Sequence, residues 1–267
     1  MNYLHVKGIF LRRFFMLMRS WPRLVDIFFW SAVSITIWGF VTLWLRGEIT
    51  EPEPKVNFVI LLLGALIFWE IFTRVQQSIA VGFLEDVWTR NVINVFVAPV
   101  SAKEFIAGLA VVALFNTALA SLFMVVFAWL LYALEIWTFG FYLIPFLVNL
   151  ILFGFSLGLI SLSLIMRFGP SVEVIAWALP FLFQPISAVF YPVSVLPVFL
   201  QKVALFLPTT HLFEGMREVL LQNVLPLDHI VWASALNVLY VWLALIFFAW
   251  ILGVVRRRGA LGRFVTD

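Results

Sequence analysis

The sequence contains no cysteine, only three histidines, and few charged residues, which make up 12% of its 267 residues. The lack of cysteine excludes disulfides, thiolate metal sites and cysteine nucleophiles. It also has no Gly-x-x-x-x-Gly-Lys-Ser/Thr loop, no His-Glu-x-x-His and no Gly-x-Ser-x-Gly motif. These motifs hold nucleotide phosphates, bind catalytic zinc and present a serine nucleophile. We therefore expect no catalytic residue, no metal site and no cofactor in this chain.

Apolar residues are abundant instead: 64% of the chain is hydrophobic, and the mean hydropathy is +1.09. Several apolar runs reach the ~20 residues with which a helix crosses a ~30 Å bilayer. The sequence therefore predicts an all-α integral membrane protein, with residues 1–267 forming one transmembrane domain. The isoelectric point of about 9.4 does not indicate nucleic-acid binding. The basic residues lie beside the apolar runs, where they determine topology, and we expect no nucleic-acid partner.

Six spans are expected. They lie at about residues 24–45, 56–72, 105–134, 140–166, 174–190 and 229–255, between short polar or Gly/Pro-containing segments. An even number puts both termini on one side. That side would carry thirteen basic residues: Lys7, Arg12, Arg13, Arg19, Arg23, Arg74, Arg90, Lys103, Arg167, Arg256, Arg257, Arg258 and Arg263. The other side would carry four, namely Arg46, Lys55, Lys202 and Arg217. This asymmetry predicts that both termini are cytoplasmic.

The first 23 residues carry scattered Lys and Arg and lack the compact apolar core of a cleavable export signal. His5, Arg12 and Arg19 recur at seven-residue spacing on one helical face, and Val6 and Phe10 belong to the opposite, apolar face. The pattern predicts an amphipathic interfacial helix over residues 1–23. A basic flank that only orients the first span is an equally good interpretation.

Residues 85–104, EDVWTRNVINVFVAPVSAKE, form the longest segment expected on the cytoplasmic side. Trp88, Val92, Val95 and Phe96 line one side of a predicted helix. Ser101-x-x-Glu104 is a capping box that would begin the third span. A membrane-surface helix and a helix seated in a partner's groove both fit this pattern. We favour the groove, because the other segments on that side are too short to form a docking surface.

Residues 191–228 contain two apolar pieces of about 15 residues each, both interrupted by charge or proline, and neither is long enough to cross a bilayer. They predict a re-entrant helical hairpin on the outer face between the fifth and sixth spans. The approach to it is punctuated by prolines that favour breaks. These are Pro180, Pro185, Pro192, Pro197 and Pro208.

The stretch LPTTHLFEGMREVL at 207–220 gathers charged groups between apolar runs. Its apolar face comprises Leu212, Phe213, Met216, Val219 and Leu220. Its polar face comprises His211, Glu214, Arg217 and Glu218. We expect Thr209 or Thr210 to cap the helix, and Glu214 to pair with Arg217 at i+3. Spacing alone favours a surface helix with a solvated charged face.

Other polar and small residues indicate helix packing. Gly154-x-x-x-Gly158, with Ser156 and Ser161, suits close approach of two helices. Glu70 and Arg74 stand four residues apart and are expected to pair near the cytoplasmic end of the second span. Interhelical hydrogen bonds are expected from Asn116, Asn149, Gln184 and Asn237.

This order of parts resembles the permease subunits of ABC-2 type exporters over nearly the whole chain. The resemblance includes the basic amphipathic N-terminus, the six spans and the cytoplasmic segment ending in APVSAKEFIAG. Its strongest part is FQPISAVFYPVSVLPVFLQKVALFLPTTHLFEGMR, in which Pro208, His211, Glu214 and Arg217 form a Pro-x-x-His-x-x-Glu-x-x-Arg pattern. Permeases of the family often have Asn-Pro where this chain has Leu207-Pro208.

The resemblance implies a permease without a nucleotide site of its own, bound to two copies of a cytoplasmic ATPase that hold ATP and magnesium. It also implies a second permease copy, in a homodimer or close heterodimer, and contact with membrane lipid in the plasma (inner) membrane of a bacterium or archaeon. The substrate would be lipid-like, a glycolipid or polysaccharide, or drug-like. The residues implied to couple the permease to the ATPase are Glu85, Trp88, Asn91, Val92, Val95 and Phe96. The hairpin at 191–228, with the motif at Pro208, His211, Glu214 and Arg217, would close the outer end of the translocation path.

Two functions from other classes are also compatible with the sequence. One is a membrane-embedded lipid-modifying enzyme that uses His211 and Glu214 as acid and base. The other is a non-catalytic membrane scaffold. A neighbouring gene for an ATPase with a phosphate-binding loop would favour the permease over both.

Overall fold

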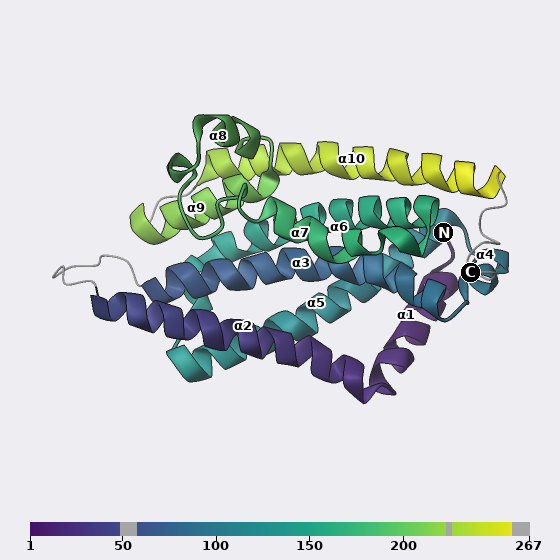
Figure 1. The fold of residues 1–267 in the computed structure, drawn as a ribbon, viewed down its shortest axis with the longest axis horizontal. Helices are drawn as coiled ribbons and strands as arrows, with labels where there is room; N and C mark the ends of the chain where they lie inside the picture. Colours follow the sequence, from purple (N-terminus) through teal and green to yellow (C-terminus); the bar gives the residue numbers. More distant parts are fainter. Residues whose placement is uncertain (49–57, 223–225, 258–267) are drawn as a thin grey trace.

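The computed structural model describes residues 1–48, 58–222 and 226–257, and within these ranges it contains helices and their connections but no strand (Figure 1). The predicted all-α fold is therefore confirmed. The α-helices are α1 (Tyr3–Met18), α2 (Trp21–Glu48), α3 (Phe58–Trp88), α4 (Val92–Val97), α5 (Ala102–Tyr132), α6 (Leu143–Phe168), α7 (Val174–Phe183), α8 (Val198–Ala204), α9 (Pro208–Gln222) and α10 (Leu227–Arg257). Three short 3-10 helices lie at Ile136–Tyr142, Pro170–Val172 and Val193–Val195.

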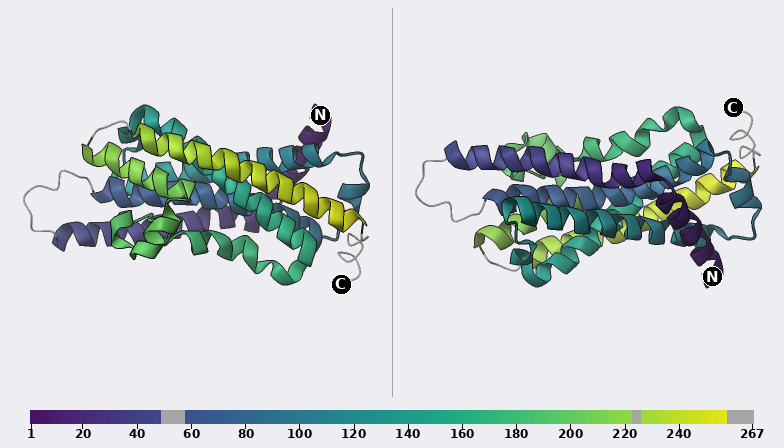
Figure 2. Two further views of the ribbon diagram at one scale, coloured as in Figure 1. Left: turned by 90° about the horizontal axis from the view of Figure 1, so that it is seen from above. Right: turned by 90° about the horizontal axis from the view of Figure 1, so that it is seen from below.

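Five helices of the described chain are long and apolar enough to cross a membrane, namely α2, α3, α5, α6 and α10. They run along the long axis of the molecule, with α3 at the centre (Figures 1 and 2). Helix α1 and the C-terminal end of α10 lie at one end, here called the terminal end; α8 and α9 lie at the other, here called the hairpin end (Figure 1). The chain is thus a multi-pass membrane protein.

The fifth expected span is not a long helix. Residues 174–190 were predicted to be one helix, but α7 ends at Phe183 after 10 residues, which cover ~15 Å, about half of a bilayer core. Pro180 lies inside α7, and Pro185 follows its end, so two backbone donors are missing within six residues. The chain then continues irregularly, with Ala188 at a positive φ of 50°. Among the described residues, no sixth helix of membrane-spanning length is present.

The second expected span is longer than predicted. Its predicted end at residue 72 is wrong, because α3 continues to Trp88 and places Glu70 and Arg74 in mid-helix. The polar residues that suggested an end face other helices instead of lipid. Gln76, for example, is fully buried, and its Nε2 donates to Ser161 Oγ on α6 at 2.9 Å.

Close packing of α6 on α3 depends on the two glycines expected to provide it. A Cβ placed on Gly154 would lie 2.7 Å from the Phe72 carbonyl oxygen, and one on Gly158 would lie 2.9 Å from the Gln76 carbonyl oxygen. Both distances are too short for any side chain. The predicted role of the Gly154-x-x-x-Gly158 stripe is confirmed.

Interhelical hydrogen bonds form at three of the four predicted amides. Asn149 Nδ2 donates to Ser234 Oγ at 3.2 Å, and Asn237 Nδ2 donates to Asn149 Oδ1 at 2.8 Å, so this pair joins α6 to α10. Asn116 Nδ2 donates to Ser78 Oγ at 3.1 Å and joins α5 to α3. The side-chain amide of Gln184, in contrast, has no hydrogen-bond partner in the described part of the chain and lines a cavity.

Helix α1 lies within residues 1–23, where an interfacial helix was predicted, and makes an angle with α2 at the terminal end (Figure 2). Its apolar face packs on α5, where Phe10 and Phe14 each make edge contacts with Phe115. Its basic face also contacts protein: His5 and Arg12 reach carboxylates of α5 and α3. These contacts hold α1 against the long helices through both of its faces.

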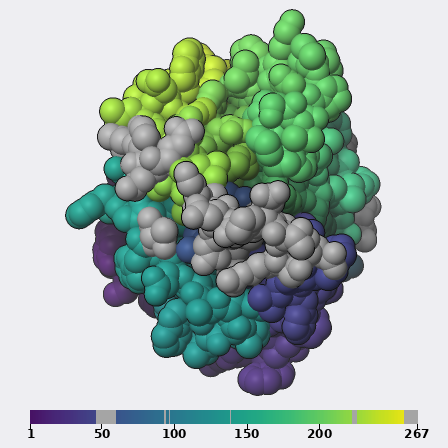
Figure 3. Space-filling view, turned by 90° about the vertical axis from the view of Figure 1, so that its left-hand side faces the viewer, coloured from purple at the N-terminus to yellow at the C-terminus, as the bar shows by residue number. Residues whose placement is uncertain are grey.

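Two short helices, α8 and α9, form the hairpin end, and α9 packs against α10 and α6. Figure 3 views the molecule from this end, where the green surface of the α8–α9 region covers one part of the face and α2 and α5 lie on another. The predicted apolar face of α9 is confirmed: Leu212, Phe213, Met216 and Val219 are buried. Thr209 and Thr210 lie inside α9, which begins at Pro208, so the predicted threonine cap is wrong.

Candidate functional site

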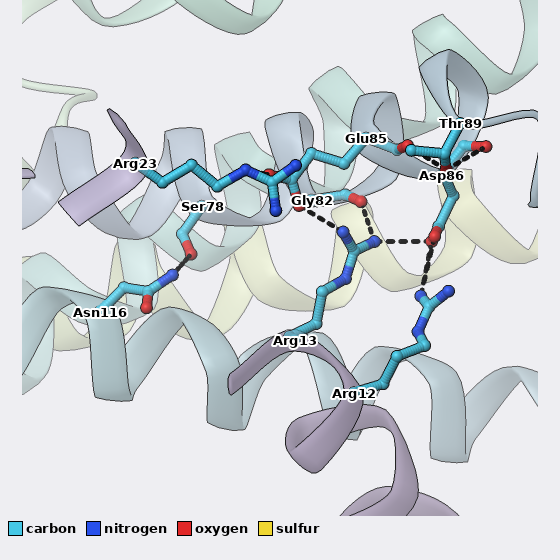
Figure 4. A network of polar contacts seen from close by, with 9 residues as sticks. All are labelled: Arg12, Arg13, Arg23, Ser78, Gly82, Glu85, Asp86, Thr89 and Asn116. Atoms are coloured by element: carbon cyan, nitrogen blue, oxygen red, sulfur yellow. Dashed lines mark hydrogen bonds and ion pairs between the residues drawn. The ribbon is translucent and has the colours of Figure 1, made fainter. Parts of the chain in front are cut away.

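The acidic pair at the end of α3 faces α1 (Figure 4). Arg13 is only 5% exposed, and its guanidinium contacts Glu85 Oε2, the Gly82 carbonyl oxygen and, at 2.6 Å, Asp86 Oδ2. Arg12 Nη2 lies 2.8 Å from Asp86 Oδ1. Burial lowers the pKa of Arg13, while the charges of Asp86 and Glu85 oppose that shift. An arginine side chain stays charged even when it is buried, so a largely buried ion-pair network links α1 to α3.

The helix predicted to carry Trp88, Val92, Val95 and Phe96 on one side is broken between Trp88 and Val92. Helix α3 ends at Trp88, Arg90 takes a positive φ of 53°, and the amide of Asn91 donates to the Asp86 carbonyl oxygen at 2.8 Å. Helix α4 then begins at Val92. Trp88 thus ends α3, and a tight turn separates it from α4. The turn forms because a non-glycine residue in the left-handed region cannot continue an α-helix.

The predicted coupling residues have different environments around this turn. Trp88 is 52% exposed, and its Nε1 donates to Glu173 Oε2 at 3.2 Å. Val92 is 1% exposed and packs into the core, while Val95 is half-buried. Asn91 is half-buried, and its Oδ1 accepts from Asn94 Nδ2. The backbone of Phe96 belongs to α4, but its side chain lies outside the described part of the structure.

The predicted capping box is present at the start of α5. Ser101 Oγ accepts from the Glu104 amide at 3.3 Å, and the Ser101 amide donates to Glu104 Oε2 at 2.9 Å. Glu104 also accepts from the Asn2 amide at 2.5 Å and contacts His5 Nδ1 at 3.1 Å. One carboxylate therefore joins the beginnings of α1 and α5.

At the hairpin end, Glu214 and Arg217 pair as predicted, at 2.9 Å. Arg217 Nη2 also donates to the carbonyl oxygen of Ala188 at 2.9 Å, and Nη1 donates to that of Val189 at 3.4 Å. Glu214 Oε1 accepts from the Val193 amide at 2.7 Å. The Ala188 and Val189 carbonyls lie in the irregular chain after α7, and the Val193 amide begins the 3-10 helix that follows. The pair therefore holds that chain against α9.

His211 and Pro208 complete the motif. His211 is only 8% exposed, and its Nε2 lies 2.9 Å from the Leu205 carbonyl oxygen. Burial lowers the pKa of His211, which favours a neutral ring that donates to this carbonyl. Pro208 occupies the first position of α9, where its missing N–H removes no helical bond. The solvated charged face that spacing alone favoured is wrong, because His211 and Arg217 are both buried.

A cavity of about 430 Å³ lies between α2, α3 and α7. Each helix contributes a stripe at three- or four-residue spacing, which is the spacing of one helical face. The stripes include Asp26, Trp30, Ser34 and Trp38 on α2; Glu70, Thr73, Arg74 and Gln77 on α3; and Trp177, Phe181 and Gln184 on and just after α7. Toward the hairpin end, Trp38 stacks on Phe190 with ring centroids 4.4 Å apart. A second cavity, of about 320 Å³, shares Asp26, Arg74, Gln77 and Trp177 and extends toward α1.

Arg74 connects two walls of this cavity. Its Nη2 donates to Ser31 Oγ at 3.1 Å and to the Ile27 carbonyl oxygen at 3.2 Å, both on α2. Its Nε lies 3.6 Å from Glu70 Oε2, so the predicted Glu70–Arg74 pair is confirmed, although in mid-helix. Placing ionisable groups at this depth of a membrane-spanning helix costs free energy, and such groups commonly mark a functional site.

The cavity was missed by the sequence reasoning, although a signal was present. The polar residues Glu70, Thr73, Arg74 and Gln77 recur at i, i+3, i+4 and i+7 on one face of α3. A polar stripe inside an apolar helix predicts a buried or water-lined face. The aromatic stripes of α2 and α7 could not be assigned in the same way, because in a chain with 12 Trp and 30 Phe such residues occur on every face.

The geometry does not favour acid–base catalysis by His211 and Glu214. His211 Nε2 is engaged by a backbone carbonyl, and Glu214 is engaged by Arg217 and by a backbone amide. Within the residues that the structure describes, no group of three or more His, Asp or Glu side chains could hold a metal ion.

A family model matches most of the chain. No curated protein matches the chain. The model of the ABC-2 type transporter family matches residues 6–221, from the first turn of α1 to the end of α9, which is most of the chain. The protein therefore belongs to the ABC-2 type transporter family, as a membrane permease of an ABC transporter and not as its catalytic subunit.

Proposed function

We propose that this chain is the permease of an ATP-driven exporter and that the cavity between α2, α3 and α7 is part of its translocation path. The polar stripe of α3 carries the proposal. Glu70, Thr73, Arg74 and Gln77 line a cavity inside a helix that is otherwise apolar enough to span the membrane. A substrate with a polar part and an apolar part fits such walls. Lipid-like, glycolipid or polysaccharide, and drug-like compounds remain the candidate classes.

Two copies of a cytoplasmic ATPase would supply ATP and magnesium and dock at the terminal end. The exposed side chains of Trp88, and of Asn94 and Val97 on α4, offer the docking surface. Val92 and Glu85 support it from behind: Val92 anchors α4 in the core, and Glu85 binds Arg13 of α1. A displacement of α4 would therefore be transmitted to α3 through the Asn91–Asp86 backbone hydrogen bond, and to α1 through the ion-pair network.

The hairpin end would act as the outer gate. Arg217 and Glu214 hold the irregular chain after α7, and this chain carries Phe190, which stacks on Trp38 at the edge of the cavity. Movement of α9 would thus shift the Trp38–Phe190 contact. This linkage gives the Pro208-His211-Glu214-Arg217 motif a mechanical role.

A second permease copy, in a homodimer or close heterodimer, would complete the path in the inner membrane of a bacterium or archaeon. The excess of basic residues on the side of the termini supports cytoplasmic termini. In accord with that topology, α1 and the C-terminal end of α10 lie at the same end of the molecule (Figure 1).

The test is reconstitution of the chain with the ATPase encoded beside its gene. Export and substrate-stimulated ATP hydrolysis should require both chains, and the purified permease alone should hydrolyse no ATP. Trp88→Ala should weaken co-purification, by ~2 kcal/mol if this indole is a buried anchor of the complex. The matched control is Trp137→Ala, which removes an indole that is 79% exposed at the hairpin end. ATP turnover by the permease alone would contradict the proposal.

A further inference from the structure

The cavity between α2, α3 and α7 carries one carboxylate without a partner. Its ionisable lining residues are Asp26, Glu70 and Arg74. Glu70 pairs with Arg74, whose Nη2 is taken up by Ile27 and Ser31. Asp26 makes no hydrogen bond or ion pair with any residue that the structure describes. The lining therefore has an excess negative charge, and that charge lies at Asp26.

The basic residue next to Asp26 on α2, Arg23, lines the second cavity beside it but pairs with Glu85 and not with Asp26. Arg23, one turn earlier on α2, has its Nε 3.4 Å from Glu85 Oε1. Glu85 in turn receives Arg13. Asp26 lines both cavities, so a ligand can reach it from either one.

Aromatic faces accompany this carboxylate. Trp30 follows Asp26 by four residues, on the same face of α2, and is 58% exposed. Trp177 of α7 lines both cavities and is 44% exposed. Indole faces attract cations most strongly among the aromatic rings. Beyond them, Phe181 and Trp38 offer an apolar surface toward the hairpin end.

We infer that this cavity binds an organic cation with an apolar tail, with its ammonium group at Asp26 between Trp30 and Trp177. The inference rests on the proposed function and narrows its substrate class. An anionic headgroup would meet Asp26 and Glu70, while Arg74 is already engaged. A neutral sugar could stack on the indoles, but it would leave the exposed Asp26 carboxylate without a partner in the cavity.

The test is equilibrium binding of radiolabelled decyltrimethylammonium, below its micellar concentration, to the permease in phosphatidylglycerol nanodiscs, with protein-free nanodiscs as background. We expect saturable binding, and a dissociation constant that rises about tenfold in Asp26→Asn. Trp30→Leu should weaken binding severalfold, and Trp30→Phe should retain most of it. Asp228→Asn, which removes an exposed carboxylate at the start of α10, is the matched control and should change nothing.

Two results would overturn the inference. One is wild-type binding of the cation no tighter than that of uncharged decyl maltoside, which has the same tail. The other is unchanged binding in Asp26→Asn. Competition with dihexanoylphosphocholine separates the two sources of the cation. Displacement assigns the site to a lipid headgroup, and its absence assigns the site to a soluble amphiphile; each result supports an ammonium site.

Binding requires no ATPase, so failure of this inference is distinguishable from failure of the proposed function. If the cation does not bind but the protein still exports another compound with ATP, only the cation inference is rejected. If the cation binds but no ATP-dependent export is found, only the proposed transport function is rejected.

Discussion

Arg13→Ala tests the attachment of α1 to the long helices. The substitution removes a buried guanidinium that contacts Glu85, Asp86 and the Gly82 carbonyl oxygen. The main loss of stability comes from Asp86, which is only 2% exposed and keeps its charge without its main partner. Removing one member of a buried ion pair typically destabilises a protein by ~3–5 kcal/mol.

Two remaining contacts reduce this effect. Arg12 still lies 2.8 Å from Asp86, and Glu85, whose side chain is 20% exposed, keeps Arg23 at 3.4 Å. We therefore expect the lower end of the range, ~3 kcal/mol, which corresponds to a fall in Tm of ~6–12 °C for a chain of this size. Part of the loss should appear as detachment of α1 before global unfolding.

The measurements are thermal unfolding of the detergent-solubilised protein and limited proteolysis of α1. Arg19→Ala is the control, because it removes the same charge from an exposed residue at the end of α1. It should change Tm by less than ~1–2 °C, as expected of a surface substitution. An Arg13→Ala protein as stable and as protease-resistant as Arg19→Ala would refute the buried network and the placement of α1 on α3.

Three further outcomes follow from the structure. Gly158→Ala should lower stability by ~1–3 kcal/mol through overpacking against the α3 backbone, whereas Gly253→Ala, with no atom within 4 Å of its added Cβ, should be tolerated in the same thermal assay. Because burial lowers the pKa of His211, the folded state favours the neutral ring, so stability should fall as pH drops below the unfolded value of ~6.5. His211→Asn should flatten the pH dependence of Tm, and an unchanged profile would reject this origin. A single cysteine at the exposed Ser194 should react with an impermeant thiol reagent added outside intact cells. One at the exposed Val97 should react only after the cells are permeabilised. Labelling of both from one side would overturn the topology.

Long-range packing explains where the sequence-based boundaries failed. Glu70 and Arg74 were expected near the cytoplasmic end of a span, where charged groups can pair or reach the lipid headgroups. That inference assumes that every face of the helix meets lipid. In the fold, α2, α6 and α7 surround α3, so its polar residues face protein and a cavity. Whether a polar residue ends a span or lines its inner face is decided by neighbours that are distant in sequence.

Short-range features were determined by the sequence itself. The apolar runs are sufficient to predict the five long helices. The Ser101–Glu104 spacing is sufficient to predict the capping box, and the i, i+3 spacing is sufficient to predict the Glu214–Arg217 pair. These depend on backbone geometry within one or two turns, which is the same in any helix.

Only the tertiary structure decided which partners the charged side chains take. Arg13 and Asp86 are 73 residues apart, and Arg217 and Ala188 are 29 apart. The cavity likewise needs three helices from separate parts of the chain to place Asp26, Trp30 and Trp177 together. Such contacts form only where the whole fold lowers the free energy enough to bring distant segments side by side, and no local pattern encodes them.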